Sequence, residues 1–282
     1  MKVIHTVSAL DKALAPYCFS GATIGFVPTM GALHEGHAAL VQQCVIENKV
    51  CVVSVFVNPT QFNNPEDLRL YPRTLETDCE LLEQLGTTFV FAPSEEEMYP
   101  EADNRLFDFG KLDKVMEGRF RSGHFNGVAQ VVSKLFDMVK PDAAYFGEKD
   151  FQQLAIIRAM TRQLDLPIRI IGVPTVREKS GLAMSSRNQR LSETEKTNAA
   201  EIYRILQEST KMTDSHSPKE VIDLVISNIN AVSSLRVEYF EVVDGNSLQS
   251  ISSWQDTNYI VGCIAVFCGD VRLIDNIQYE AP

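Results

Sequence analysis

The sequence predicts an α/β protein in which a parallel sheet with helices on both faces is followed by a smaller α+β C-terminal domain. Short apolar runs rich in β-branched residues alternate with helical patterns through the first two-thirds of the chain, and this alternation implies a parallel sheet with right-handed crossovers. The runs are apolar throughout, which is typical of strands covered on both faces. The pattern changes near residue 176, so we expect one domain over 1–176 and a second over 177–282.

Helical periodicity and apolar runs give the elements of the first domain. In one helix, Leu75, Cys79, Leu82 and Leu85 recur at helical spacing, and Gly86 is well suited to end it. The expected strands are residues 23–27, 50–57, 88–91, 143–146 and 168–173, and the expected helices are residues 38–48, 75–85, 128–139 and 154–164. Ligands of parallel sheets bind at the carboxyl ends of the strands, so the loops that follow the strands are the expected place for a site.

Capping residues mark the helices of the second domain. Ser192 and Glu195 form a capping box that opens a helix ending near residue 211. Ser217 is a cap followed by Pro218 at the first helical position and Glu220 at the third. The expected strands are residues 236–243, 259–267 and 271–274, the last two joined as a hairpin through residues 269–270.

Composition and charge exclude several classes of protein. Of 282 residues, 45% are hydrophobic and 22% charged, which excludes a disordered chain, a rod and a disulfide-stapled miniprotein. The net charge of -11 disfavours binding of a nucleic-acid backbone. The six cysteines form no C-x-x-C pair, and we interpret them as reduced, mostly buried thiols of a cytoplasmic protein. Neither a signal peptide nor a run long enough to span a bilayer is expected.

A glycine-bracketed segment with two histidines follows the first expected strand. Residues 28–37 read Pro-Thr-Met-Gly-Ala-Leu-His-Glu-Gly-His, and the helix start after them suits a phosphate. His34 and His37 are three residues apart, so on a helical turn they share a face and could stabilise charge on phosphate oxygens. The alternative is that His37 only caps or packs. A metal site is disfavoured, because the spacing is not H-E-x-x-H.

Polar side chains also follow the second and fourth expected strands. Gln61 lies just beyond the strand at 50–57 and offers donors and an acceptor to a polyhydroxy substrate. Lys149 follows the strand at 143–146 and could neutralise a phosphate, while Asp150 could accept from ribose hydroxyls. The alternative is that Asp150 caps a helix with Gln153 as its partner three residues later.

Basic and hydroxyl residues follow the last expected strand of the first domain, at 168–173. Basic residues also precede the expected helix at 128–139. Ser185, Ser186 and Arg187, with Gly181 as a candidate hinge, could clamp a polyphosphate. The segment 119–127 concentrates positive charge, including Arg121, in an acidic chain. It is either a solvated loop or a polyphosphate contact.

Long motifs in a fixed order, covering nearly the whole chain, resemble the pantothenate synthetase (pantoate–β-alanine ligase) family. Residues 28–37 resemble that family's version of the HIGH nucleotide motif, and residues 184–187 its counterpart of the KMSKS loop. The other matching segments are 56–62, 71–74, 124–128, 146–150, 241–244 and 273–277. The chain departs from the family at Ser122, where Pro is usual, at Arg190, where an aromatic is common, and at residues 38–39, Ala-Ala in place of a common Leu.

The resemblance implies a cytosolic ligase on a Rossmann-like nucleotidyltransferase fold. Such an enzyme condenses (R)-pantoate with β-alanine through a pantoyl-adenylate intermediate and cleaves ATP to AMP and diphosphate. ATP would be the co-substrate and Mg²⁺ the cofactor. The expected partners are these small molecules and a second copy of the chain in a homodimer, and neither a nucleic acid nor a membrane.

The resemblance also assigns roles to single residues. His37 would be the proton donor, His34 would donate to the phosphates and Lys149 would stabilise the α-phosphate, so these three are the expected catalytic residues. The expected ATP-binding residues are Met30, Gly31, Ala32, Leu33, His34, Glu35, Gly36, His37, Arg121, Gly147, Glu148, Lys149, Asp150, Val176, Met184, Ser185, Ser186 and Arg187. The expected pantoate and β-alanine site consists of Met30, Gln61 and Gln153, and no protein metal ligand is expected.

Two other functions remain open from the residues alone. A transferase that adenylates a phosphate monoester on the same fold would need no β-alanine, but the neutral Gln61 and Gln153 suit pantoate hydroxyls better than a second phosphate. A nucleotide-binding regulatory module would need a phosphate cradle but not the two histidines, the lysine and the arginine expected to converge there. A tRNA-charging enzyme is disfavoured by the charge of -11.

Overall fold

The computed structural model describes residues 1–62 and 65–281 of the chain. Contacts divide the chain into two compact units. The N-terminal unit contains Met1–Phe109, Arg121–Glu148 and Gln153–Pro174, and the C-terminal unit contains Gly110–Phe120, Lys149–Gln152 and Thr175–Pro282. Two short segments that precede residue 175 in the chain therefore belong to the C-terminal unit.

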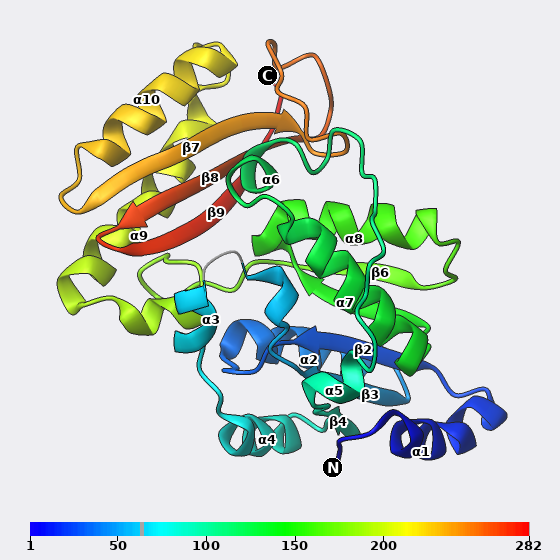
Figure 1. Ribbon diagram of the computed structural model, residues 1–282. Helices are drawn as coiled ribbons and strands as arrows, with labels where there is room; N and C mark the ends of the chain where they lie inside the picture. The colour runs from blue at the N-terminus through cyan, green and yellow to red at the C-terminus, as the bar shows by residue number, and fades with distance from the viewer. Residues whose placement is uncertain (63–64, 282) are drawn as a thin grey trace. The chain divides into compact units, whose positions relative to one another are not determined.

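Within its described residues, the N-terminal unit is built on a six-stranded, wholly parallel sheet with strand order β1-β4-β3-β2-β5-β6 (Figure 1). The strands are β1 (Lys2–Ile4), β2 (Ile24–Thr29), β3 (Val50–Val55), β4 (Phe89–Phe91), β5 (Ala143–Gly147) and β6 (Arg169–Val173). The predicted parallel sheet is thus confirmed. β1 was not predicted, because three residues with only Ile4 buried give no pattern that distinguishes them from a loop.

Helices cover both faces of this sheet, as predicted. On one face, Val41 of α2 and Leu82 of α4 share a core with Val27 and Val53 of the sheet. On the other face, Phe136 of α7 packs edge-on against Phe26. The helices of the unit are α1 (Val7–Ser20), α2 (Glu35–Glu47), α3 (Pro65–Leu70), α4 (Leu75–Gln84), α5 (Glu95–Met98), α7 (His124–Val139) and, from Gln153 onward, α8 (Phe151–Gln163).

The centre of the sheet is the place where the strand order reverses. β2 pairs with β3 along its whole length and with β5 on its other side, from Gly25 opposite Ala143. The chain therefore runs from β2 through β3 to β4 on one side, and returns to the opposite side for β5 and β6. In open α/β sheets, ligands bind beyond the carboxyl ends of the strands at such a reversal. The loops after β2, β3 and β5 are the ones at this place.

Three helices begin earlier than the sequence predicted. α2 begins at Glu35 instead of residue 38, α7 at His124 instead of residue 128, and α8 at Phe151 instead of residue 154. The segment 119–127 is therefore not a solvated loop throughout, because His124, Phe125 and Gly127 are buried in α7. Gly127 resembles a turn residue in the sequence, but the reason for a glycine is contact: a Cβ there would lie 2.6 Å from the carbonyl oxygen of Thr60.

The C-terminal unit is an antiparallel sheet, three-stranded in the part of the chain that the structure describes, packed against two helices. Its elements are α6 (Met116–Phe120), α9 (Glu193–Ser209), α10 (Pro218–Asn230), β7 (Leu235–Asp244), β8 (Ile260–Cys268) and β9 (Val271–Tyr279). The capping boxes at Ser192 and Ser217 are present, and a two-residue turn joins β8 to β9. β9 is five residues longer than predicted, because Asp275 and Asn276 interrupt its apolar pattern.

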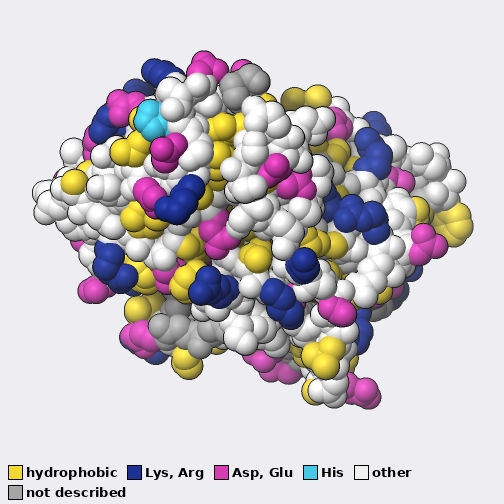
Figure 2. All heavy atoms as spheres, turned by 90° about the horizontal axis from the view of Figure 1, so that it is seen from above, with side chains coloured by type: hydrophobic (Ala, Val, Ile, Leu, Met, Phe, Trp, Pro, Cys, Tyr) yellow, Lys and Arg dark blue, Asp and Glu magenta, His cyan; other side chains and the backbone are white. Residues whose placement is uncertain are grey.

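Charged side chains of both signs share the surface (Figure 2), and the cysteines are free thiols. On the face drawn in Figure 2, Lys and Arg side chains lie interspersed with Asp and Glu. Each cysteine is a free thiol, and Cys44, Cys51, Cys263 and Cys268 are buried. Among the residues that the structure describes, no helix has both the length and the apolar character needed to cross a bilayer.

Candidate active site

The loop after β2 is a tight turn that begins with hydrogen bonds of the Thr29 side chain. The hydroxyl of Thr29 donates to the carbonyl of Ser54 at 2.7 Å and accepts from the N–H of Gly31 at 3.2 Å. Gly31 has a φ of +80° and Ala32 a φ of +51°, both in the left-handed region that favours glycine. The turn directs the chain from the carboxyl end of β2 into α2.

A buried carboxylate from another helix holds this turn. Asp78 of α4, 3% exposed, accepts the N–H of Ala32 at 3.0 Å through one oxygen and the N–H of Leu33 at 2.8 Å through the other. Asp78 was not predicted from the sequence. A signal existed, because Asp78 lies four residues before Leu82, on the side of the helix expected to be apolar.

The two histidines cap α2 together. Nδ1 of His34 accepts from the N–H of Gly36 at 3.1 Å, and Nδ1 of His37 accepts from the N–H of His34 at 3.3 Å. The ring centroids are 4.1 Å apart. His37 therefore does cap α2, as the alternative interpretation expected. Capping also determines the tautomer of each neutral ring, because a ring that accepts at Nδ1 carries its proton on Nε2. Both rings lie at the positive end of the helix dipole, which favours an anion.

Gln61 lies beside Met30, and both were predicted for the same substrate site. Nε2 of Gln61 is 3.1 Å from Sδ of Met30. The backbone carbonyl of Gln61 accepts from Nδ1 of His124 at 2.9 Å, so the proton of that neutral ring lies on Nδ1. His124 is 5% exposed and contacts the loop from the first turn of α7, a role that was not predicted for it.

The other predicted residues of the N-terminal unit lie at the end of β5 and at helix starts. Gly147 is the last residue of β5, and Glu148 follows it with its carboxylate against Gly172 of β6, where a Cβ would be 2.9 Å away. Gln153 lies in the first turn of α8. The carbonyl of Arg121 accepts the N–H of His124 at the start of α7.

In the C-terminal unit, Lys149 and Asp150 form a short turn. Nζ of Lys149 is 3.2 Å from a carboxylate oxygen of Asp150, and the carbonyl of Lys149 accepts from the Asn276 side chain at 3.0 Å. Asp150 directly precedes α8, the position that its alternative role as a helix cap requires.

The loop that carries the paired serines is anchored to β9. The carbonyl of Val176 accepts the N–H of Met184 at 3.0 Å, and Oγ of Ser185 accepts the N–H of Arg187, which caps a short helical turn at Ser186–Arg190. Arg177 next to Val176 forms a bidentate pair with Asp275 of β9, at 2.6 and 2.9 Å. This anchor was not predicted from the sequence.

Known proteins resemble this chain over nearly its whole length. The family model described as pantoate-beta-alanine ligase matches residues 2–278. A pantothenate synthetase of Bacteroides fragilis (strain YCH46) is 60% identical over 280 residues, which are 99% of each chain. The chain belongs to the pantoate–β-alanine ligase family. This confirms the predicted family, and with it the predicted enzyme class and reaction of a pantoate–β-alanine ligase.

Other relatives also match this ligase over nearly its full length. A pantothenate synthetase of Porphyromonas gingivalis (strain W83) is 56% identical over 280 residues, 99% of this chain and 100% of the relative. The crystal structure of pantothenate synthetase from Thermus thermophilus matches with a TM-score of 0.93 and 43% identity, covering 99% of this chain and 100% of that chain. Pantoate-beta-alanine ligase from Francisella tularensis, complexed with beta-gamma ATP and beta-alanine, matches with a TM-score of 0.84, 35% identity and coverage of 99% and 97%.

The predicted site residues of this ligase divide between its two units. The N-terminal unit holds the turn with both histidines, Gln61, Arg121, Gly147, Glu148 and Gln153, and the C-terminal unit holds Lys149, Asp150, Val176 and residues 184–187. Among the described residues, no group of three or more His, Cys, Asp or Glu side chains is placed to hold a metal ion.

Proposed function

We propose that this chain joins (R)-pantoate to β-alanine, with ATP cleaved to AMP and diphosphate, through a pantoyl-adenylate intermediate. Membership of the family supports the proposal, as does the Francisella tularensis relative with beta-gamma ATP and beta-alanine bound. The observation that carries it is the arrangement of His34 and His37 on the first turn of α2, directly after the central strand β2. This arrangement suits an anion that gains charge during a reaction.

The reaction needs an adenylate because a carboxylate does not condense with an amine at neutral pH. In the first step a carboxylate oxygen of pantoate attacks the α-phosphorus of ATP, and the bond to diphosphate breaks. In the second step the amine of β-alanine attacks the acyl carbon, and AMP leaves with the electron pair of the acyl–oxygen bond. The protein contributes positioning and donors to the phosphates, with little covalent chemistry of its own.

Residues of the N-terminal unit have two tasks in this proposal. His34 and His37 donate through Nε2–H to phosphate oxygens, with His37 as the main donor, and the backbone of residues 30–37 follows the nucleotide. Arg121 and the residues around Gly147 contact ATP. Met30, Gln61 and Gln153 hold pantoate, and the contact between Gln61 and Met30 supports placing these two at one substrate. Gln61 also helps to receive β-alanine.

Residues of the C-terminal unit hold the nucleotide in this proposal. Lys149 stabilises the α-phosphate, Asp150 binds the nucleoside, and Val176 offers backbone groups to adenine. Ser185, Ser186 and Arg187 hold the β- and γ-phosphates.

We also propose that the domain over residues 177–282 acts as a lid during the reaction. Small-angle scattering with and without ATP plus pantoate tests this, and identical profiles would contradict it.

Mg²⁺ enters this proposal bound to ATP, because a hard cation prefers phosphate and water oxygens to most protein groups. When bound, it neutralises charge on the phosphates.

We further propose a homodimer, to be checked by analytical ultracentrifugation. We also propose a cytoplasmic location, which the buried free thiols favour.

The reaction can be tested directly with the purified chain. ATP, pantoate, β-alanine and Mg²⁺ are expected to give AMP and pantothenate in equal amounts. Appearance of ADP would contradict the adenylate route. A transferase that adenylates a phosphate monoester would instead form a dinucleotide-like product and show no dependence on β-alanine.

A further inference from the structure

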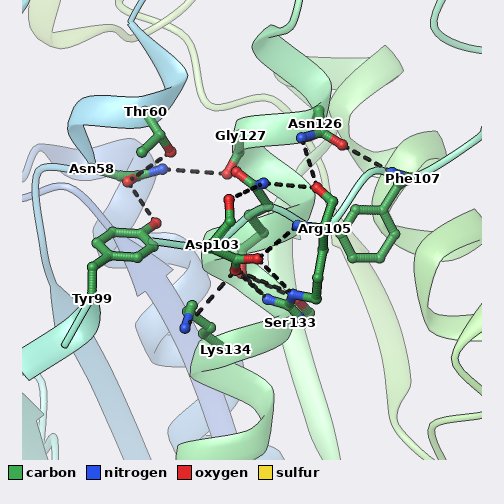
Figure 3. Close-up of polar contacts among 11 residues, drawn as sticks. Asn58, Thr60, Tyr99, Asp103, Arg105, Phe107, Asn126, Gly127, Ser133 and Lys134 are labelled. Atoms are coloured by element: carbon green, nitrogen blue, oxygen red, sulfur yellow. Dashed lines mark hydrogen bonds and ion pairs between the residues drawn. The ribbon is translucent and has the colours of Figure 1, made fainter. Parts of the chain in front are cut away.

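Asn58, which follows β3, is buried and held on every side by hydrogen bonds. It is 1% exposed. Its Nδ2 donates to the carbonyl of Gly127 and to Oε1 of Gln61, both at 3.3 Å. Its Oδ1 accepts from the hydroxyl of Tyr99 at 2.8 Å and from that of Thr60 at 3.1 Å (Figure 3). These contacts fill the hydrogen-bonding capacity of the amide, with two donors and two lone pairs used.

The contacts determine which way the Asn58 amide points. A backbone carbonyl can only accept, so Nδ2 must face Gly127, and Oδ1 must therefore face the two hydroxyls. Because Nδ2 also faces Gln61, the Gln61 amide turns its oxygen toward Asn58 and its NH₂ toward Met30. Sulfur is a weak acceptor, so a carboxylate or hydroxyl oxygen of a substrate would replace it with a gain in free energy.

We propose that Tyr99 is a positioning residue of the acid-substrate site, acting through Asn58 on the orientation of the Gln61 amide. This inference rests on the proposed function, in which Gln61 holds pantoate. Thr60 is a neighbour of Asn58 in the chain, whereas Tyr99 reaches it from the segment after α5. The Tyr99 hydroxyl thus connects the loop that carries Asn58 and Gln61 to a part of the N-terminal unit that is distant in the chain.

The surroundings of Tyr99 keep its hydroxyl a donor in a fixed place. Burial raises the pKa of Tyr99, so the hydroxyl stays protonated at neutral pH. The ammonium of Lys134 lies 5.4 Å from the ring centroid, and Lys134 is also 3.9 Å from Asp103. Asp103 in turn pairs with Arg105 (Figure 3), whose guanidinium donates to a backbone carbonyl of α7. The segment carrying Tyr99 is therefore fastened to α7, the helix that also provides Gly127.

Loss of the Tyr99 hydroxyl would leave the orientation of the Asn58 and Gln61 amides less well fixed. Asn58 would keep a donor only from Thr60, and its amide would turn more freely. Gln61 would then present its oxygen to the substrate carboxylate for part of the time, and two acceptors repel each other. We expect Tyr99→Phe to raise the KM for pantoate about 5–20-fold, the range of one lost hydrogen bond. The KM for ATP should change less than about twofold.

The decisive experiment places Tyr99→Phe in the wild type and in a Gln61→Ala background, and measures kcat and each KM by AMP release. If Tyr99 acts through Gln61, its effect on the KM for pantoate disappears in the Gln61→Ala background. An effect of equal size in both backgrounds, or an unchanged KM in the wild type, would overturn the proposal. An equal rise in the KM for ATP would also overturn it, because it would indicate general damage.

Control variants keep the result interpretable. Tyr145→Phe removes another buried hydroxyl, one that donates to Glu47 at 2.8 Å, and should leave the KM for pantoate unchanged. Thr60→Val removes the second donor to Asn58 and should raise that KM in the same way, which tests the proposal should Tyr99→Phe fail to fold. If the unmodified chain shows no pantoate-dependent AMP release, the proposed function itself fails. If it turns over and the variants do not differ from it, only the positioning role fails.

Discussion

Asp78 and Leu33 lie 45 residues apart in the chain, and the carboxylate of Asp78 accepts the backbone N–H of Leu33 at 2.8 Å. Its other oxygen accepts the N–H of Ala32, which has a positive φ that a non-glycine residue rarely adopts. The carboxylate therefore stabilises the turn that leads into α2, and it does so from α4. The orientation of His34 and His37 depends on this turn, because both cap the helix that begins there.

Asp78→Asn is expected to lower both stability and activity. Each carboxylate oxygen accepts one N–H, so an amide must direct its NH₂ against one of these donors. Leaving a buried donor unsatisfied costs about 1–3 kcal/mol, and the displaced turn should lower kcat at least ~10-fold. Thermal unfolding and AMP release measure the two effects. Asp223→Asn removes an exposed carboxylate of α10 that pairs with Lys219 and should change neither quantity; a stable, fully active Asp78→Asn would contradict the role.

His37→Ala is expected to lower the rate of adenylate formation about 10²-fold or more, the effect of losing one oxyanion-type donor. Because His37 also caps α2, this variant alone does not separate rate from folding. His37→Gln can still accept the N–H of His34, as Gln does at this position of a capping box, yet it lacks the imidazole. We expect His37→Gln to unfold at nearly the wild-type temperature and to release diphosphate as slowly as His37→Ala. Unchanged diphosphate release from either variant would remove His37 from the mechanism.

Apart from β1, the sheet could be predicted from the sequence, and the supports of the site could not. Apolar runs such as Val50–Val55 identify strands because burial on both faces leaves few polar positions, and the loops after them follow from topology. The start of α7 was missed because Asn126 and Gly127 carry turn signals, and only the close approach of Thr60 explains the glycine. The sequence marks Asp78 as a carboxylate on the apolar side of its helix, but it contains no pattern that identifies the partners of Asp78 and Tyr99, which lie 46 and 41 residues away.

Glu241→Gln is expected to stabilise the C-terminal unit at neutral pH. Burial raises the pKa of Glu241, and the charge of Arg119 nearby offsets this effect only in part. The folded state thus binds the proton more tightly than the unfolded state, in which the pKa is about 4.3. Stability is therefore lost as pH rises through the raised pKa and stays low at pH 7. Glu241→Gln should unfold at a higher temperature than wild type at pH 7 and at the same temperature below about pH 4.

The matched control for that change is Glu101→Gln, at an exposed position. We expect it to leave the dependence of the unfolding temperature on pH unchanged. If Glu241→Gln were less stable than wild type at pH 7, the carboxylate would be contributing more through its partners than burial costs, and the sign of the effect would be reversed.

Arg272 of β9 joins the segment 110–120 to the C-terminal sheet. Its guanidinium binds both carboxylate oxygens of Glu117, at 2.6 and 2.9 Å, and also contacts Glu238 of β7. The Tyr239 hydroxyl donates to Glu117 at 2.9 Å. Glu117 is 7% exposed, so its charge depends on these partners. This explains why a segment far from residue 175 in the chain belongs to the C-terminal unit.

Removing one partner of this pair should cost more than removing both. Arg272→Met leaves Glu117 buried without its cation and is expected to lower the free energy of unfolding by about 3–5 kcal/mol. The double variant Arg272→Met with Glu117→Met replaces the pair by apolar side chains and should be more stable than the single variant. Urea unfolding followed by the fluorescence of Trp254, the single tryptophan of the chain and buried in the C-terminal core, measures both. If the double variant lost as much free energy of unfolding as Arg272→Met and Glu117→Met lose together as single variants, the ion pair would have no coupling energy and could not be what holds the segment to the sheet.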